Sequence, residues 1–323
     1  MSSRIAHATV ELNDAAAAAL LPPRPARGHK GTFGKLLVIA GSVDYAGAAF
    51  LVCTAAGRAG AGLVTLATLE SLQPLFATKV VEATTLSLPE DDVEEVDPEE
   101  ALARILDHEH DALVVGPGLK PSLSMTALIQ ALLAGDEDGE PMPAVIDAEA
   151  LRSLATVDGW AAEVTARCVL TPHVGEFRRL RAADGHSPEA DGDLVNDDER
   201  RVAAARAAAA EWGQVVVLKG ARTVIAEPDG RVAVAPFENP ALASGGTGDV
   251  LAGTIGALLA QGLGTFEAAQ LGVYLHGLAG EAVRARLGDS GLLASDLPPE
   301  LPLARKRLAA AAAAAADGTD SAG

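Results

Sequence analysis

Short apolar runs alternate along most of the chain with longer stretches of helical periodicity. The runs are continuous rather than alternating, are rich in Val, Ile and Leu, and end in Gly, Pro, Asp or Thr. Strands of this kind are buried on both faces, as in a parallel sheet whose crossovers are helices. We predict strands within 35–41, 63–68, 112–118, 143–148, 168–172 and 215–220, and helices at 46–61, 122–134, 149–156, 196–213, 247–262 and 265–287.

Two segments depart from this pattern. Residues 223–235 read TVIAEPDGRVAVA, in which two apolar runs flank Pro-Asp-Gly. Such a turn between strand-like runs predicts a hairpin, so we expect an antiparallel hairpin late in an otherwise parallel sheet. Residues 90–100, EDDVEEVDPEE, are strongly acidic and are expected to form a solvated connection.

The chain has 323 residues, of which 49% are hydrophobic, and this is enough for one α/β domain with a large core. We expect that domain to span residues 28–303. Residues 1–27 are predicted to form an N-terminal extension, which ends within the proline-rich stretch PPRPARGHK, residues 22–30. Residues 304–323 form an alanine-rich tail that we expect to be disordered.

Charge and cysteine content narrow the class of protein. With 25 basic and 44 acidic residues the formal net charge is −19. This charge repels nucleic acid and anionic membrane surfaces, so neither is an expected partner. There is no leader-like start and no run of about 18 apolar residues, which favours a cytoplasmic protein. Cys53 and Cys168 lie far apart in apolar segments and are predicted to be reduced core residues.

Glycines and polar residues gather where the predicted strands end. In open α/β sheets, ligands bind beyond the carboxyl ends of the strands, so residues distant along the chain should meet at one rim. The residues at these ends are Gly41, Ser42, Gly116–Gly118, Asp147, His173 and Lys219.

The loop SGGTGD, residues 244–249, leads into a predicted helix and carries one carboxylate. Its glycines allow close approach of an anion, and the helix start presents free N–H groups, so Gly245, Gly246, Thr247 and Gly248 are predicted to form an anion hole. Asp249 is either a first-turn charge that complements the helix dipole or a general base. A carboxylate beside bound phosphate adds electrostatic repulsion. This cost is best explained if Asp249 accepts a proton from a hydroxyl group, so the role of general base is favoured.

Two further rim residues have alternative roles. Lys219 ends a buried strand and should reach a phosphate or carboxylate, unless its side chain extends past the strand end to solvent. His173, in LTPHVGEF, contacts ligand or caps the following helix. The chain has no GxxxxGK[ST], HExxH or CxxC pattern, which argues against a Walker nucleotide site and a structural zinc site.

Several motifs together resemble a known family. HKGTFGKLLVIAGSVDYAGAAFL, VVGPGL, VIDAEAL, LTPHVGEFRRL, VVVLKGARTVIA and NPALASGGTGDVLAG occur in this order over roughly residues 28–290. They resemble the ADP-dependent NAD(P)H-hydrate dehydratases of the ribokinase-like superfamily. The resemblance implies a three-layer ribokinase-like fold with helices on both faces of the sheet. One departure is DAEALR, where the family pattern resembles Asp-Ala-Asp-Ala-Leu-Asn, so that Glu149 and Arg152 are substitutions.

The resemblance also implies an activity. ADP would phosphorylate the ring hydroxyl of the S epimer of hydrated NADH or NADPH, giving AMP, and loss of phosphate would restore the reduced cofactor. Asp249 would be the catalytic base and, with Ala48, Gly118 and His173, would line the hydrate site. Gly248 and KGART would bind the nucleotide, and Mg²⁺ is expected with unassigned ligands. The KGART residues are Lys219, Gly220, Ala221, Arg222 and Thr223.

A homo-oligomer, and an epimerase carried on a separate chain, are also expected. Two other functions remain open on the sequence. One is an ATP-dependent kinase of the same superfamily acting on hydroxyethylthiazole or hydroxymethylpyrimidine. The other is a nucleotide sensor without catalytic activity.

Overall fold

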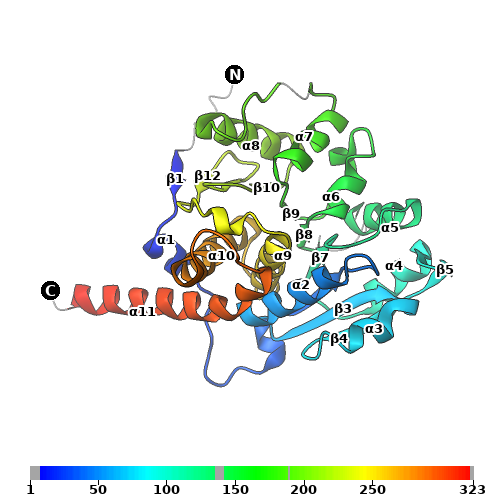
Figure 1. Ribbon diagram of the computed structural model, residues 1–323, viewed down its shortest axis with the longest axis horizontal. Helices are drawn as coiled ribbons and strands as arrows, with labels where there is room; N and C mark the ends of the chain where they lie inside the picture. Colours follow the sequence, from blue (N-terminus) through cyan, green and yellow to red (C-terminus); the bar gives the residue numbers. More distant parts are fainter. Residues whose placement is uncertain (1–7, 135–141, 188–189, 321–323) are drawn as a thin grey trace.

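A computed structural model describes residues 8–134, 142–187 and 190–320 (Figure 1). Ten strands among these residues form one sheet in the order β1-β12-β11-β10-β9-β8-β7-β2-β3-β4. Every strand of this sheet is parallel to its neighbours except β11, which is antiparallel to β10 and β12. The mostly parallel sheet and its late hairpin are therefore confirmed. The strands are β1 Thr9–Glu11, β2 Lys35–Ile39, β3 Leu63–Leu69, β4 Thr84–Leu88, β7 Ala112–Val115, β8 Ala144–Ile146, β9 Cys168–Leu170, β10 Val215–Leu218, β11 Val224–Ala226 and β12 Val232–Val234.

Helices cover both faces of the sheet, as predicted (Figure 1). The chain moves from β7 through β8 and β9 to β10 in one direction and from β2 to β3 in the other. Right-handed crossovers therefore place the connecting helices on opposite faces. One face carries α2 Ala46–Ala59, α9 Thr247–Ala260 and α10 Thr265–Leu287, and the other carries α4 Pro98–Asp107, α5 Leu123–Ala134, α6 Glu149–Leu154, α7 Val174–Ala183 and α8 Asp198–Trp212. The short α3, Gln73–Ala77, precedes β4.

A close approach of α2 and α9 determines how their first turns face each other. A Cβ added at Gly253 in α9 would lie 2.3 Å from the carbonyl oxygen of Val52 in α2, so only glycine allows the two backbones to touch. Ala48 and Asp249 each lie one helical turn earlier on these helices. The contact therefore brings two predicted site residues to the same edge of the sheet.

Described residues on both sides of the predicted domain boundaries at 28 and 303 pack on the domain. β1 adds an edge strand beside β12, and α1, Asp14–Ala19, packs on the C-terminal helix α11, Leu301–Asp320 (Figure 1). The first part of the predicted disordered tail is thus helical, and Leu308 within it is fully buried. Residues 1–7 and 321–323 lie outside the described residues.

This docking of α11 predicts a stability effect. Leu308→Ala should lower the free energy of unfolding by about 3 kcal/mol, because it removes a fully buried leucine side chain and leaves a cavity. Leu303→Ala is the matched control, since that leucine lies on the same helix but is 57% exposed. Urea unfolding of both variants measures the difference. Equal stability of the two variants would contradict the packing described for α11.

The acidic segment 90–100 is also more ordered than predicted. It forms a small hairpin of β5, Glu90–Asp92, and β6, Glu95–Val96, followed by the start of α4. Val96 is 1% exposed, and the Asp97 side chain caps α4 by accepting hydrogen bonds from the N–H groups of Glu99 and Glu100. Hydrogen bonds from Ser71 to Glu90 and from Ser124 to Glu95 also hold this charged segment against its neighbours.

Candidate active site at the carboxyl edge of the sheet

The predicted anion hole is a rigid turn at the start of α9. Gly246 has a φ of 90° and precedes Thr247, the first residue of the helix. The Thr247 hydroxyl donates to the carbonyl oxygens of Leu242 (2.9 Å) and Ser244 (3.0 Å). His276 of α10 contacts the Thr247 carbonyl oxygen through Nε2 at 2.9 Å, and burial lowers the pKa of His276 to about 4. A neutral His276 therefore donates this hydrogen bond and holds the first turn of α9 in place.

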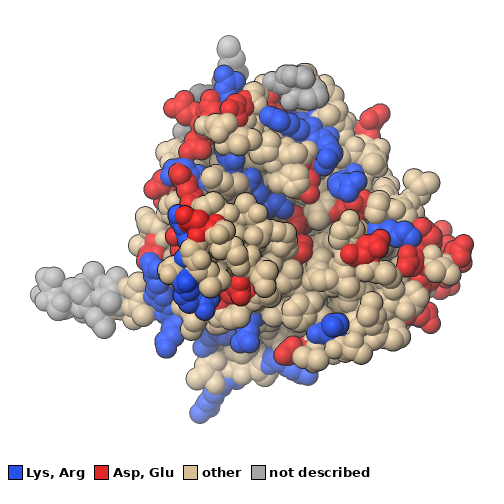
Figure 2. Space-filling view, viewed as in Figure 1, with Lys and Arg blue, Asp and Glu red and all other residues tan. Residues whose placement is uncertain are grey.

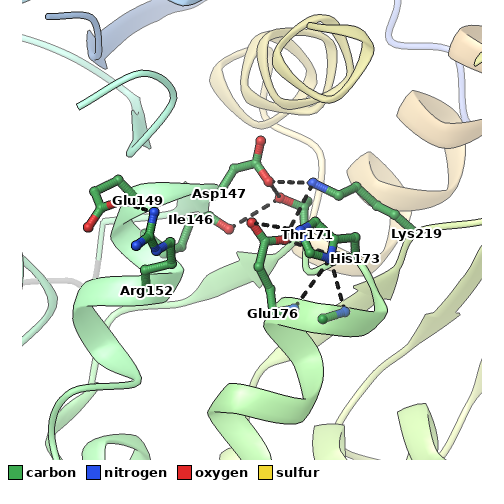
Figure 3. Close-up of polar contacts among 9 residues, drawn as sticks. Ile146, Asp147, Glu149, Arg152, Thr171, His173, Glu176 and Lys219 are labelled. Carbon is green, nitrogen blue, oxygen red and sulfur yellow. Dashed lines mark hydrogen bonds and ion pairs between the residues drawn. The ribbon is translucent and has the colours of Figure 1, made fainter. Parts of the chain in front are cut away.

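An ion pair lies beside this turn, at the ends of β8 and β10. Lys219 Nζ is 2.6 Å from Asp147 Oδ1, and the Thr171 hydroxyl donates to the same oxygen at 2.8 Å (Figure 3). Asp147 is 1% exposed. Burial by itself lowers the pKa of Lys219, but the charges of Asp147 and Glu176 raise it by more. Lys219 is therefore a charged, partly buried ammonium with 19% of its side chain exposed, in agreement with the prediction that it reaches a carboxylate.

Asp249 lies within electrostatic reach of this pair. Burial raises its pKa, the neighbouring Asp147 raises it further, and Lys219 lowers it, with a net result of about 7. Gly248 separates the groups without filling the space, since a Cβ there would lie 3.4 Å from Lys219 Nζ and 3.8 Å from Asp147 Oδ2. A carboxyl group with a pKa near neutrality is well suited to accept a proton.

His173 is the N-cap of α7. Its Nδ1 accepts hydrogen bonds from the N–H groups of Gly175 (3.0 Å) and Glu176 (3.3 Å), while Glu176 Oε2 accepts from the His173 N–H at 2.9 Å (Figure 3). The backbone of His173 also bridges to Lys219. The capping role is therefore present, and the half-exposed ring still lies at the rim, where its contact with the hydrate stays a prediction.

The two substituted residues of DAEALR pair with each other. Arg152 Nη1 lies 3.2 Å from Glu149 Oε2, and in Figure 3 this pair lies apart from the Asp147–Lys219 pair. Burial raises the pKa of Glu149, and Arg152 counteracts this rise. Ala148, between Asp147 and Glu149, has a φ of 51°, which is strained for a residue other than glycine and directs the chain sharply into α6.

A cavity of about 510 Å³ opens between the ion pair and α10. Four of the five KGART residues line it, together with Gly248. Its remaining wall is largely apolar and includes Phe237, Leu242, Leu251 and Val273. Lys219 and Glu238 are the charged residues of the lining, and the volume, the lysine and the apolar wall suit a nucleotide. The four lining KGART residues are Lys219, Gly220, Ala221 and Thr223.

The side chain of the fifth residue, Arg222, is directed elsewhere. Its guanidinium pairs with Glu11 at 2.7 Å and with Asp198 at 2.9 Å, which ties the loop after β10 to β1 and to α8. Its backbone N–H donates to the Phe237 carbonyl oxygen at 2.8 Å. Arg222 thus holds the loop in its conformation. Its side chain does not line the cavity, so a contact between this side chain and the nucleotide stays a prediction.

Ala48 and Gly118, the predicted hydrate-site residues, are neighbours. A Cβ added at Gly118 would lie 2.6 Å from the Ala48 Cβ and 2.8 Å from the Tyr45 carbonyl oxygen. At the other side of α2, a Cβ on Gly246 would lie 2.7 Å from Leu51 Cδ1. The start of α2 is therefore packed between the Gly118 loop and the Gly246 turn, and the predicted hydrate and phosphoryl positions adjoin.

The predicted Mg²⁺ has no resident site in the described part of the chain. Within residues 8–134, 142–187 and 190–320, no group of three or more His, Cys, Asp or Glu side chains is placed to hold a metal ion. Asp147, the most buried carboxylate at the rim, is already bonded to Lys219. The residues present thus do not fit a protein-held metal. A nucleotide-borne Mg²⁺ would have to take its oxygen ligands from phosphates and water.

Sequence reasoning missed four residues of this site. Thr171 and Glu176 lie two and three residues from His173, which the sequence analysis identified. His173 and Glu176 have the spacing of a capping box, and this spacing could have predicted the role of Glu176. His276 and Phe237 belong to segments with no distinctive pattern. Their positions depend on the packing of α10 and of the hairpin, which sequence spacing does not show.

The fold and the site together define a protein of the ribokinase-like class. Ribokinase from Cryptococcus neoformans in complex with ADP superposes with a TM-score of 0.53 over 84% of this chain and 99% of its own, at 15% identity, which shows the fold alone. An ADP/ATP-dependent NAD(P)H-hydrate dehydratase from Bacillus subtilis, co-crystallised with ATP/Mg²⁺, gives a TM-score of 0.76 at 33% identity, over 93% of this chain and 98% of its own.

The sequence model of the NAD(P)H-hydrate dehydratases matches residues 36–303, and the chain belongs to this family. An ADP-dependent (S)-NAD(P)H-hydrate dehydratase of Neisseria meningitidis is 36% identical over 87% of this chain and 88% of its own length. The bifunctional NAD(P)H-hydrate repair enzyme Nnr of Moorella thermoacetica is 41% identical over 89% of this chain and 52% of its own. The chain thus spans about half the length of such bifunctional relatives. None of the helices described is long and apolar enough to cross a membrane.

Proposed function

We propose that this protein repairs hydrated NADH and NADPH by ADP-dependent dehydration of the S epimer. The observation that carries the proposal is a carboxyl group with a pKa of about 7, Asp249, in the first turn of a helix whose free N–H groups adjoin a nucleotide-sized cavity. The family to which the chain belongs and its Neisseria relative support the same activity.

The proposed chemistry assigns one role to each group. Asp249 takes the proton of the ring hydroxyl, whose oxygen attacks the β-phosphorus of ADP and displaces AMP. The N–H groups of Gly245, Gly246 and Gly248 would stabilise the charge on the transferred phosphoryl group, each worth about 3 kcal/mol. The Thr247 N–H, the fourth donor predicted from the sequence, donates to the Ser244 carbonyl oxygen at 3.4 Å in this structure. The ring nitrogen lone pair then expels phosphate, and loss of the proton at the adjacent ring carbon restores the double bond of the reduced cofactor. Ala48, Gly118 and His173 would line the ring.

The nucleotide would lie in the 510 Å³ cavity. Lys219 would bind its phosphates at the rim, and the backbone of residues 219–223 would follow the ribose region. The apolar wall with Phe237 would cover the base, since flat aromatic bases bind well against apolar and aromatic surfaces. Mg²⁺, if used, would enter on the phosphates.

The activity is tested by mixing the protein with hydrated NADH and ADP. The reduced-nicotinamide absorbance should return, with one AMP and one phosphate per cofactor restored. A kinase acting on a small alcohol would instead leave a stable phosphorylated product, and a sensor would bind ADP without turnover. We also propose that the chain works as a homo-oligomer and in sequence with a separate epimerase, which sedimentation and coupled assays with mixed epimers would test.

The rate should depend on pH through Asp249. A base must be ionised to accept a proton, so kcat/KM for the hydrate should rise with pH and level off above about 7. In Asp147→Asn the like charge that helps to raise the Asp249 pKa is gone, so the rise should move to lower pH. The measurement is a pH profile of kcat/KM for the hydrate, with the hydrate well below its KM and ADP saturating.

A matched control separates charge from hydrogen bonding. Thr171→Val removes the hydroxyl that donates to Asp147 but leaves the carboxylate, so it should keep the midpoint of the wild-type profile. If Asp147→Asn and wild type share one midpoint, Asp147 does not set the pKa of the catalytic base.

A further inference from the structure

We propose that Ser42 and Thr68 form a subsite that binds the carboxamide of the nicotinamide ring. This subsite, here called the hydroxyl pocket, lies beyond the ends of β2 and β3 and has no assigned role. The proposal rests on the proposed function and specifies how the same site holds its substrate.

Two buried hydroxyl groups without partners mark the pocket. Ser42 is 6% and Thr68 is 3% exposed, and neither side-chain oxygen has a hydrogen-bond partner among the described residues. A buried hydroxyl that makes no hydrogen bond is costly, and such groups are uncommon in native proteins. Both residues line one small cavity of about 20 Å³ at this edge of the sheet. Two unpaired hydroxyls that share a cavity indicate a ligand that satisfies both.

The pocket adjoins the predicted hydrate residues. Leu119 and Lys120, which line it, directly follow Gly118, and Ser42 lies in the loop that leads to Ala48. The two loops are joined by a hydrogen bond from the Gly41 N–H to the Pro117 carbonyl oxygen at 2.9 Å. A ring that lies against the surface formed by Ala48 and Gly118, which contact each other, can therefore extend a short substituent into the pocket while its C6 hydroxyl faces the turn at Gly246.

The chemistry of the lining selects a small neutral group. A hydroxyl both donates and accepts, and a primary amide offers one acceptor oxygen and a donor NH₂, so the two sets are complementary. The volume admits one small polar group and excludes a ring. An anion is disfavoured, because Lys120 at the border is already paired with Glu94 at 3.0 Å and acidic side chains gather over the edge that carries β5 and α4 (Figure 2).

The test compares two identical substitutions on one strand. Thr68→Val should raise the KM for hydrated NADH about tenfold, leave kcat and the KM for ADP near wild type, and leave the unfolding midpoint unchanged or higher. The stability result is expected because an unpaired hydroxyl is replaced by a methyl group of similar shape. Ser42→Ala should act in the same direction.

Thr65→Val is the matched control. Thr65 is also buried on β3, but its hydroxyl is hydrogen-bonded to Thr84 at 2.8 Å, so this variant should lose stability and keep the wild-type KM for the hydrate. The hydrate of the 3-acetylpyridine analogue of NADH, which lacks the amide NH₂, should bind more weakly than hydrated NADH to wild type and equally to Thr68→Val.

Outcomes of these assays separate the subsite from the activity. If wild type turns over the hydrate and Thr68→Val and Ser42→Ala keep its KM, the hydroxyl pocket binds no part of the substrate. If wild type with ADP neither restores nor binds hydrated NADH, the proposed function itself fails.

Discussion

Asp249→Asn should lower the rate of cofactor restoration by about a thousandfold or more while ADP binding persists. The amide cannot take the hydroxyl proton, and loss of a positioned base typically costs this much. Nucleotide contacts are expected to survive because Lys219 is unchanged and the substitution alters only a side chain of the first turn of α9, not its backbone N–H groups. The measurement is single-turnover restoration of reduced-nicotinamide absorbance, with ADP affinity determined by calorimetry.

The stability of this variant provides its control. The pKa of Asp249 is raised from 3.8 to about 7 in the folded state, so the folded protein binds more protons than the unfolded chain between these values. The contribution of Asp249 to stability therefore falls as pH rises from about 4 to 7. Asparagine removes this penalty, and at pH 8 the variant should unfold at the same temperature as wild type or higher. Restoration at the wild-type rate would rule Asp249 out as the base.

Lys219→Met should have the second large effect, on both folding and nucleotide binding. It leaves Asp147, which is 1% exposed, as an unpaired buried carboxylate, and breaking a buried pair in this way costs about 3 kcal/mol or more. ADP should bind on the order of 10- to 100-fold more weakly, because a charge-assisted contact with phosphate is lost. Urea unfolding and calorimetry measure the two effects.

The double variant Asp147→Asn with Lys219→Met separates these effects. Replacing the carboxylate removes the uncompensated charge, so most of the lost stability should return, while ADP affinity stays low. If ADP affinity returned with stability, Lys219 would hold the loop rather than the nucleotide.

The central strands and the rim residues could be predicted because each depends on local pattern. Continuous Val, Ile and Leu runs marked β2, β7 and β10, and the rule that ligands bind beyond strand ends brought Asp147, Lys219 and Asp249 together. The edge strands gave no such signal. β1 is the exposed tripeptide TVE, and β4 is TTLSL, and neither contains a continuous run of Val, Ile and Leu. Each forms a strand because it pairs with the neighbouring strand of the sheet.

Long-range pairing accounts for most of what the sequence did not show. The Arg222 side chain pairs with Glu11, 211 residues away, as well as with Asp198, and α11 packs on α1 and α10. These partners are not visible from spacing along the chain. The Glu149–Arg152 pair is different, because residues three apart on a helix face each other. An ion pair between these two substituted residues could therefore have been predicted from the sequence.

A base that titrates near 7, as we propose for Asp249, would also connect the rate of cofactor repair with the rate at which the hydrates form. Hydration of a dihydropyridine ring begins with protonation of a ring carbon, so the hydrates accumulate fastest in acid. Asp249 loses its ability to accept a proton over the same range, because its pKa is about 7. Damage would therefore outrun repair during acid stress, and the hydrates formed then would be cleared once neutral pH returns.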